Sequence, residues 1–266
     1  MSAAIPILMY HAVAEHPAAA TRRLSVRPEM LAAQLASLRQ QGFTTLTFSR
    51  LGAALRGGGA LPPRPIVLTF DDGYADFHRE ALPLLARYGC TATLFVTTGW
   101  VADAGEHAAG TPLDRMLSWS QIDEVFAAGF EVGAHSHSHA QLDQLPDAAL
   151  RQELSVSKVL LEDRLGREVP GLAYPYGYSS ARVREAVCAA GYRHAAAVSN
   201  ATARPKADLF ALPRLTIRRS TSLDTFRQII NGQGIPKIFF ADRALTAGWS
   251  MVRRSRYAVL SARDHA

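Results

Sequence analysis

Two adjacent carboxylates at the end of a short apolar run are the residues best placed to do chemistry in this chain. Asp71 and Asp72 follow the run 66–70 and precede Gly73. Two acids behind a buried strand are costly to desolvate, but they become tolerable if one binds a cation and the other transfers protons. Asp-Gly is also a common turn dipeptide, so the pair taken alone would equally fit a turn.

Three histidines within five residues supply the second half of the argument. His135, His137 and His139 follow the apolar run 130–134. Two imidazoles and one carboxylate form a sensible ligand set for a catalytic Zn²⁺ whose fourth position holds water. We expect His135 and His139 to bind one ion with one of the two aspartates, and His137 to point elsewhere. The same donors would also fit the facial triad of a non-haem Fe(II) oxygenase, or a polar loop of solvated histidines.

The alternation of short apolar runs with helical patterns shows how these residues could be brought together. Such repeated βα units predict an α/β fold with a parallel sheet, open or closed into a barrel. Each candidate residue follows an expected strand, and in a βα barrel these points converge on one face. We expect strands at 5–9, 43–48, 66–70, 91–97, 130–134, 171–174, 192–198 and 212–217, helices at 28–41, 75–88, 120–128, 148–165 and 180–190, a long loop at 98–118, and a last element at 225–230.

Composition bounds the class of protein. With 266 residues, 48% hydrophobic and 20% charged, the chain is long enough for one large α/β domain. The net charge of +6 is concentrated near the C-terminus, so a nucleic-acid-binding body is not expected. Cys90 and Cys188 lack the spacing of a metal site. Because no signal peptide and no membrane-spanning run is recognisable, we expect a cytoplasmic protein.

The last residues differ from the rest. We divide the chain into one domain at residues 1–235 and a basic extension at 236–266, where Lys and Arg interleave with apolar residues. Such a segment could form a helix lying on an anionic membrane surface, giving a peripheral membrane contact. A basic capping helix and a disordered tail are the alternatives. The apolar members of this segment are Phe239, Phe240, Leu245, Trp249, Met251 and Val252.

Three segments resemble the signature motifs of the polysaccharide deacetylases, carbohydrate esterases of family 4. They are 69–73 (Thr-Phe-Asp-Asp-Gly), 135–139 (His-Ser-His-Ser-His) and 172–177 (Leu-Ala-Tyr-Pro-Tyr-Gly). The segment 8–13 is similar to the opening of one branch, which includes the poly-β-1,6-N-acetylglucosamine deacetylases. The resemblance implies a distorted (β/α)₇ barrel that hydrolyses an N-acetyl, sometimes an O-acetyl, group on a sugar with the help of a metal.

Residue by residue, the resemblance assigns the two aspartates to different roles. Asp72, with His135 and His139, would bind the metal, with Zn²⁺ first and Co²⁺, Ni²⁺ or Mn²⁺ as alternatives. Asp71 would be the general base that takes a proton from the attacking water. Spacing alone could not rank the two acids.

The resemblance extends to the remaining catalytic groups, with two departures. The Tyr176 backbone N–H would help hold the oxyanion, and His11 would be the general acid. Many relatives carry an arginine where this chain has Ala173, so we take Arg214 as the candidate substitute that orients the base. A late catalytic histidine of many relatives is also absent near residues 215–217, which gives His11 its importance.

The substrate is less defined than the reaction. Trp119, Tyr74 and Pro175 are candidates for lining a carbohydrate pocket. The expected substrate is a glycan or glycan precursor that carries an N-acetylated amino sugar. A deformylase or another amidase acting on a lipid-linked or small sugar is the alternative hydrolase. A non-catalytic glycan-binding protein on the same fold is the alternative outside enzymes.

Overall fold

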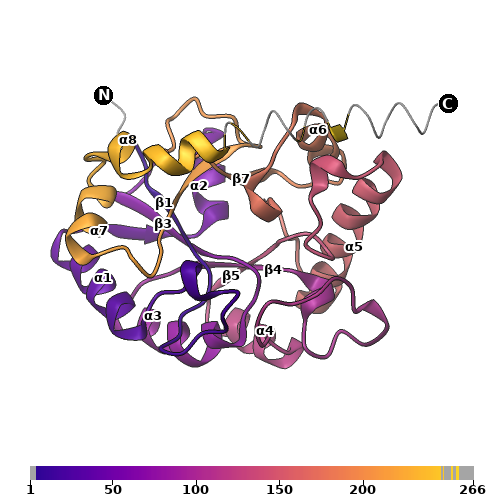
Figure 1. Cartoon of the computed structure of the whole chain (residues 1–266), viewed down its shortest axis with the longest axis horizontal. Helices are drawn as coiled ribbons and strands as arrows, with labels where there is room; N and C mark the ends of the chain where they lie inside the picture. The colour runs from indigo at the N-terminus through magenta and orange to yellow at the C-terminus, as the bar shows by residue number, and fades with distance from the viewer. Residues whose placement is uncertain (1–3, 247, 249–252, 254–255, 258–266) are drawn as a thin grey trace.

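The computed structural model describes residues 4–246, 248, 253, 256 and 257. Its centre is a sheet whose strands all run parallel, surrounded by helices (Figure 1). The strands are β1 (Ile7–Tyr10), β2 (Thr44–Leu46), β3 (Pro65–Phe70), β4 (Thr93–Val96), β5 (Glu131–Ala134), β6 (Gly171–Ala173), β7 (His194–Val198) and β8 (Leu212–Thr216).

The sheet closes into a barrel through β1. This strand pairs with β3 on one side, from Ile7 opposite Val67 onward, and with β8 on the other. The closed ring runs β1-β3-β4-β5-β6-β7-β8, and β2 joins it only along the first half of β3. The chain therefore forms the predicted single-domain α/β barrel with seven strands in the ring.

The helices lie outside the barrel and are defined by ordinary capping chemistry. Ser118 and Gln121 form a capping box at the start of α4, and α5 ends at Gly166, whose φ is 64°. Their bounds are α1 (Pro28–Gln40), α2 (Phe48–Leu55), α3 (Leu82–Arg87), α4 (Trp119–Ala127), α5 (Asp147–Leu165), α6 (Ala181–Ala189), α7 (Leu223–Ile230) and α8 (Ile235–Ile238).

The helices α2 and α8 have no counterpart among those expected from the sequence, and two segments differ in length or type from the expectations. The strand expected at 43–48 is shorter, because Thr47 caps α2 by accepting a hydrogen bond from the Arg50 amide. The helix expected at 75–88 begins as a π-helical turn over Phe77–Ala81 before α3. Pro83 explains that turn, because it has no N–H to donate to the preceding turn of an α-helix.

The inward-facing strand residues fill the interior of the barrel but leave space for one long side chain. Phe95 of β4 is fully buried there, and a side chain at Gly133 would overlap its ring. Ala173 and Ala196 are also buried in this cluster. These small residues leave space for the long side chain of Arg214, which reaches inward from β8 and is 0% exposed.

The C-terminal extension is described only in part. Residues 240–246 are helical, and Arg253 and Tyr257 contact the barrel domain. Trp249, Met251 and Val252, which belong to the predicted membrane-facing helix, lie outside the described residues. Within the described chain, every helix is too short or too polar to cross a membrane.

Candidate active site

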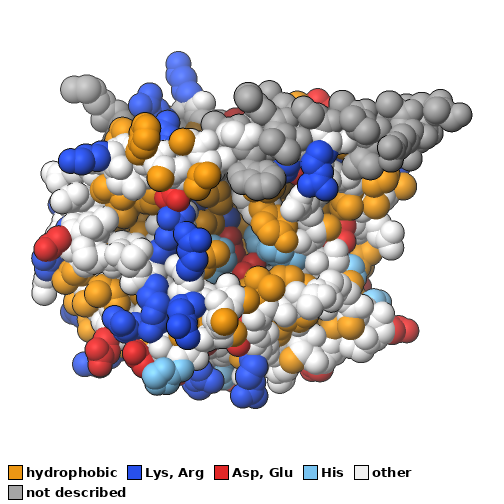
Figure 2. All heavy atoms as spheres, viewed as in Figure 1, with side chains coloured by type: hydrophobic (Ala, Val, Ile, Leu, Met, Phe, Trp, Pro, Cys, Tyr) orange, Lys and Arg blue, Asp and Glu red, His pale blue; other side chains and the backbone are white. Residues whose placement is uncertain are grey.

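A cavity of about 220 Å³ opens at the carboxyl ends of the barrel strands. Figure 2 shows acidic and histidine side chains at the bottom of this hollow. The cavity collects most of the residues that we selected from the sequence: His11, Asp71, Asp72, Tyr74, His135, His139, Tyr176 and Arg214. Segments separated by up to 203 residues therefore meet at one site.

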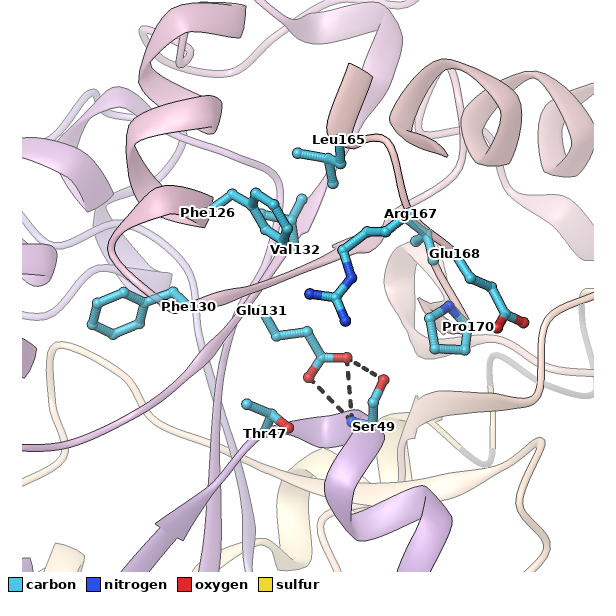
Figure 3. A pocket seen from close by; sticks show the side chains of 12 residues that line it. Thr47, Ser49, Phe126, Phe130, Glu131, Val132, Leu165, Arg167, Glu168 and Pro170 are labelled. Atoms are coloured by element: carbon cyan, nitrogen blue, oxygen red, sulfur yellow. Dashed lines mark hydrogen bonds between the residues drawn. The ribbon is translucent and has the colours of Figure 1, made fainter. Parts of the chain in front are cut away.

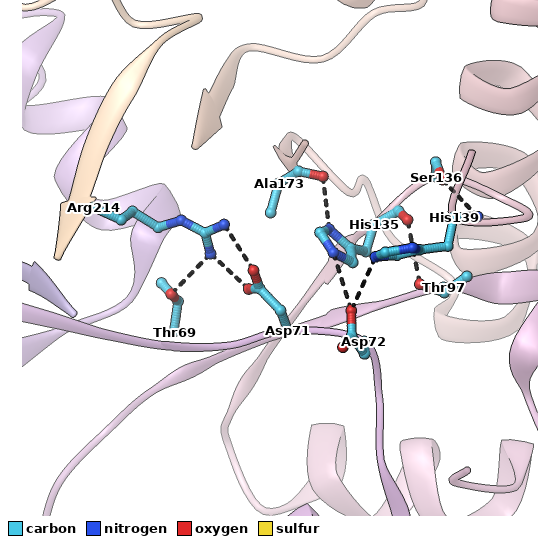
Figure 4. A network of polar contacts seen from close by, with 9 residues as sticks. All are labelled: Thr69, Asp71, Asp72, Thr97, His135, Ser136, His139, Ala173 and Arg214. Carbon is cyan, nitrogen blue, oxygen red and sulfur yellow. Dashed lines mark hydrogen bonds and ion pairs between the residues drawn. The ribbon is translucent and has the colours of Figure 1, made fainter. Parts of the chain in front are cut away.

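The two aspartates face opposite partners. Asp71 continues the inward alternation of β3 and meets Arg214, whereas Asp72 faces the histidines (Figure 4). Asp72 has a φ of 78°, in the left-handed region that non-glycine residues rarely adopt. The chain thus leaves the strand between the two carboxylates, and this lets neighbouring residues serve separate networks.

Arg214 holds Asp71 in a two-pronged ion pair. Its Nη1 donates to Asp71 Oδ1 at 2.6 Å, and its Nη2 donates to Oδ2 at 2.7 Å. Nη1 also donates to Thr69 Oγ1 at 3.1 Å, and Nε donates to the Ala197 carbonyl at 3.4 Å. Burial alone would raise the pKa of Asp71, but the Arg214 charge holds the carboxyl pKa below its usual range. Asp71 is therefore ionised and fixed in orientation.

Asp72, His135 and His139 form a cluster with the geometry of metal ligands. Asp72 Oδ1 lies 3.2 Å from His135 Nε2 and 3.3 Å from His139 Nε2. Neighbouring ligands of a tetrahedral Zn²⁺ with bonds of 2.0–2.1 Å lie about 3.3 Å apart. Asp72 Oδ1 is buried without a hydrogen-bond partner among the described residues. The residues present therefore fit a divalent metal ion.

His135 is oriented for this role by the backbone of β6. Its Nδ1 lies 2.8 Å from the Ala173 carbonyl oxygen, which leaves Nε2 as the lone-pair atom facing Asp72. Burial opposes the charged imidazolium, but Asp71 and Asp72 together raise the pKa of His135 above its ordinary value. Such a negatively charged pocket favours a bound cation.

The histidine loop 135–139 is held by Ser136 and by Glu153 of α5. Ser136 Oγ accepts the His139 amide at 3.1 Å. The Glu153 carboxylate accepts the backbone N–H groups of residues 137 and 138, at 2.9 and 2.8 Å. His137 turns away and its Nδ1 lies 2.9 Å from Thr98 Oγ1, so it lies outside the ligand cluster, as expected.

The loop 98–118 covers the side of the site and supplies an aromatic residue that we did not select. Trp100 is 4% exposed, and its ring centroid lies 4.6 Å from that of His139. Trp119, selected instead, does not line the cavity. It occupies the first position of α4, packs against the core, and has Arg164 above its ring. The only signal for Trp100 in the sequence is its type, a large apolar side chain next to Gly99 in a loop.

His11 follows β1 and lines the cavity beside both aspartates. Its Nδ1 is buried and has no hydrogen-bond partner within the described part of the chain. Burial lowers the pKa of His11, against the opposing effect of the two carboxylates. The side chain is thus available to a molecule in the cavity.

The third motif forms the tight turn η6 (Pro175–Gly177). Tyr176 has a φ of 60°, and a side chain at Gly177 would overlap Val198. The Tyr176 amide donates to no acceptor in the described residues, whereas the Gly177 amide donates to the Tyr174 carbonyl. Pro175 is buried and shapes the turn but does not line the cavity. Tyr74 lines the cavity and is 2% exposed.

A second cavity, of about 410 Å³, opens at the amino ends of β5 and β6 (Figure 3). Its central acid, Glu131, accepts the Ser49 amide at 3.1 Å and the Thr93 hydroxyl at 2.7 Å. These contacts hold the start of α2 against the barrel. Glu131 is therefore engaged in structural bonds, in contrast to the unpartnered Asp72 and His11 atoms of the first cavity.

Solved structures with the same architecture include a deacetylase. A Streptococcus pyogenes deacetylase, PplD, solved with acetate, superposes with a TM-score of 0.77 at 26% identity, over 86% of this chain and 99% of that one. IcaB from Ammonifex degensii superposes with a TM-score of 0.73 at 25% identity, over 86% of this chain and 96% of that one.

Sequence comparison leads to the same group. The poly-beta-1,6-N-acetyl-D-glucosamine N-deacetylase of Escherichia coli strain K12 is 27% identical over 249 residues. The match covers 81% of this chain, which spans only 37% of that protein's length. The family model for polysaccharide deacetylase matches residues 58–195, which hold Asp71, Asp72 and the histidine loop. The chain belongs to the polysaccharide deacetylase family.

Proposed function

We propose that this chain removes N-acetyl groups from an amino sugar in a glycan or glycan precursor. It belongs to the polysaccharide deacetylase family, and its relatives include enzymes named N-deacetylases, which hydrolyse carbon–nitrogen bonds of carbohydrates. The observation that carries the proposal is the pairing, in one cavity, of an oriented ionised carboxylate at Asp71 with the ligand cluster of Asp72, His135 and His139. A glycan-binding protein would have no use for an arginine-held base beside a ligand cluster.

Each group would have one task in the hydrolysis. A divalent metal held by Asp72, His135 and His139, with Zn²⁺ as our first choice, would polarise the acetamide carbonyl and acidify a water molecule. Asp71 would accept the proton of the attacking water, because Arg214 keeps its carboxylate ionised and aimed.

The remaining groups would act on the oxyanion and on the leaving amine. The free Tyr176 N–H would donate a hydrogen bond to the carbonyl oxygen as negative charge develops on it. His11 would donate a proton to the departing nitrogen, since an amine leaves readily only when protonated. Its position in the same cavity as Asp71 supports this role.

Three variants test the assignment. Asp71→Asn should retain the bound metal but lose turnover, whereas His135→Ala should lose both. His137→Ala is the matched control, because this histidine of the same loop faces Thr98. The measurements are metal content and acetate released from a panel of N-acetylated glycans, with formate release measured on N-formyl sugars. Substantial activity in Asp71→Asn would show that another group is the base.

We also propose that residues 1–235 form the catalytic unit and that the extension at 236–266 adds a membrane contact. Phe240 and Leu245 are 73% and 62% exposed, and the exposed cations Lys237 and Arg243 lie near them in sequence. Exposed apolar residues beside cations favour an anionic lipid surface. Replacing both apolar residues by serine should abolish co-sedimentation with vesicles containing phosphatidylglycerol. Unchanged sedimentation would refute the membrane contact.

A further inference from the structure

We propose that the C-terminal extension completes a sugar-binding subsite beside the active site, by bracing the aromatic pair Tyr176 and Tyr178 with Arg253. The inference rests on the proposed function, since it assigns the subsite to a sugar next to the acetylated one. In this view Tyr176 touches the glycan, while Tyr178 and Arg253 are positioning residues.

The aromatic pair stands at the rim of the cavity. Tyr176 is 52% exposed and lines the cavity, and its ring packs against the His139 ring at a centroid distance of 4.8 Å. The Tyr178 ring stacks on Tyr176 at 5.9 Å with an interplanar angle of 19°. A large aromatic ring kept half exposed next to a ligand cluster offers an apolar face to whatever enters the cavity.

Arg253 holds this pair from the side away from the cavity. Its guanidinium lies over the Tyr178 ring, and its Nε donates to Asp143 Oδ2 at 2.7 Å. The Arg253 carbonyl also accepts a hydrogen bond from Gln144. At 9% exposure Arg253 is far more buried than an arginine of a surface tail. The contacts therefore run from the extension through two rings to His139.

A second contact fixes the same part of the extension. The Tyr257 ring lies 4.3 Å from the guanidinium of Arg182 on α6. Arg182 in turn donates to the carbonyl oxygens of Asp143 and Leu145. Arg253 and Tyr257 thus dock on one platform around Asp143. These contacts hold Arg253 in place against the Tyr178 ring.

The chemistry of the rim fits a neutral sugar ring. Tyr176 presents an aromatic face, and pyranose rings pack their C–H groups against such faces. Leu113, 47% exposed, adds another apolar surface to the cavity lining. Arg218 lines the cavity too, but Asp242 of the extension pairs with it through two contacts of 2.9 Å. Because this cation is compensated, the subsite favours an uncharged sugar over an anionic one.

The test compares a large and a small acetylated substrate. In Arg253→Met, KM for an N-acetylglucosamine oligomer should rise about five-fold or more, the loss expected when an aromatic contact is misplaced. The kcat on the oligomer and hydrolysis of 4-nitrophenyl acetate, which is too small to reach the rim, should stay within two-fold. Tyr178→Phe should keep the wild-type KM because it keeps the ring, and Tyr178→Ala should behave like Arg253→Met. Arg243→Met, an exposed arginine of the same extension, is the matched control.

Binding of the oligomer to Asp71→Asn, measured by calorimetry with and without Arg253→Met, separates this inference from the proposed function. If the wild type releases no acetate yet binding weakens with Arg253→Met, the function fails and the subsite stands. If acetate is released and neither KM nor binding changes in Arg253→Met or Tyr178→Ala, the subsite is overturned. If the oligomer is neither cleaved nor bound, both are overturned. Thermal unfolding of each variant shows whether a loss reflects the rim or the whole fold.

Discussion

Replacing Arg214 by methionine should reverse the direction in which the pKa of Asp71 is shifted. The two side chains are 0% and 2% exposed and are joined by hydrogen bonds of 2.6 and 2.7 Å. Removing one partner of such a buried pair leaves an uncompensated charge and costs about 3–5 kcal/mol. We expect Arg214→Met to lose that much free energy of unfolding at pH 7. We also expect it to lose nearly all deacetylation, because Asp71 would be protonated or misdirected.

The free energy of unfolding should depend on pH differently in the wild type and in Arg214→Met. In the wild type the folded pKa of Asp71 lies below its unfolded value. Its contribution is therefore present above about pH 4 and is lost as the pH falls through the folded pKa. In Arg214→Met, burial without the cation should place the folded pKa above the unfolded value. The difference in free energy of unfolding between wild type and Arg214→Met should then shrink as the pH falls from 7 toward 4.

Urea unfolding in the presence of a chelator, so that metal binding does not contribute, measures both effects. Asp71→Asn/Arg214→Met carries neither charge and should regain at least half of the lost stability. If Arg214→Met alone does not fold, recovery of a folded protein in the double variant still tests the prediction. The reasoning is refuted if Arg214→Met is destabilised by less than 1 kcal/mol at pH 7, or if the double variant is no more stable than the single one.

Three further predictions concern His194, Glu153 and His11. Burial lowers the pKa of His194 from 6.5 to about 3, so lowering the pH from 7.5 to 5 should remove about 2 kcal/mol of unfolding free energy; His194→Gln should lose this component, and an unchanged pH slope in urea titrations would count against it. Glu153→Gln keeps the shape of the acid that holds the loop 135–139 but weakens its bonds to two amides, so metal affinity, followed by competition with a chelating dye, should fall about 10-fold. His11→Asn should lower kcat on the glycan about 100-fold while metal content stays at the wild-type level, and loss of the metal would instead make this histidine part of the ligand cluster.

The parts of the fold that could be predicted are those written in local patterns. The apolar run of β3 and the glycines that end several helices predict the elements around Asp71 and Asp72 closely. The helix α2 is not among the expected helices, although its start signal is present in the sequence. Thr47 is a good N-cap and the residues after it are amphipathic, but the strand-like residues before it dominated the interpretation.

The contacts that orient the site are tertiary, and no local pattern encodes them. Arg214 could be suggested only as a cation following an apolar stretch. Its reach to Asp71 depends on the small side chains at Ala173 and Ala196, on strands distant in sequence. Glu153 is a helix residue like many others, and only the fold brings it to the histidine loop. Trp100 and Trp119 both border the same loop, and sequence gave no means of telling which one faces the site.

Strained backbone conformations are concentrated at the active site, where side chains must be held in position before a ligand binds. Among the described residues, six non-glycine positions have a positive φ, and four of them are Asp72, Ser136, His139 and Tyr176. Each such position costs on the order of 1 kcal/mol and persists only where its surroundings enforce it. Here they do so through Ser136 Oγ, the Glu153 carboxylate and the tight turn at Gly177. Asp72 Oδ1 already stands at the separation from each histidine Nε2 that neighbouring ligands of a tetrahedral ion have, so metal binding need not order the loops. It follows that mutations relieving this strain should stabilise the fold while loosening the metal site.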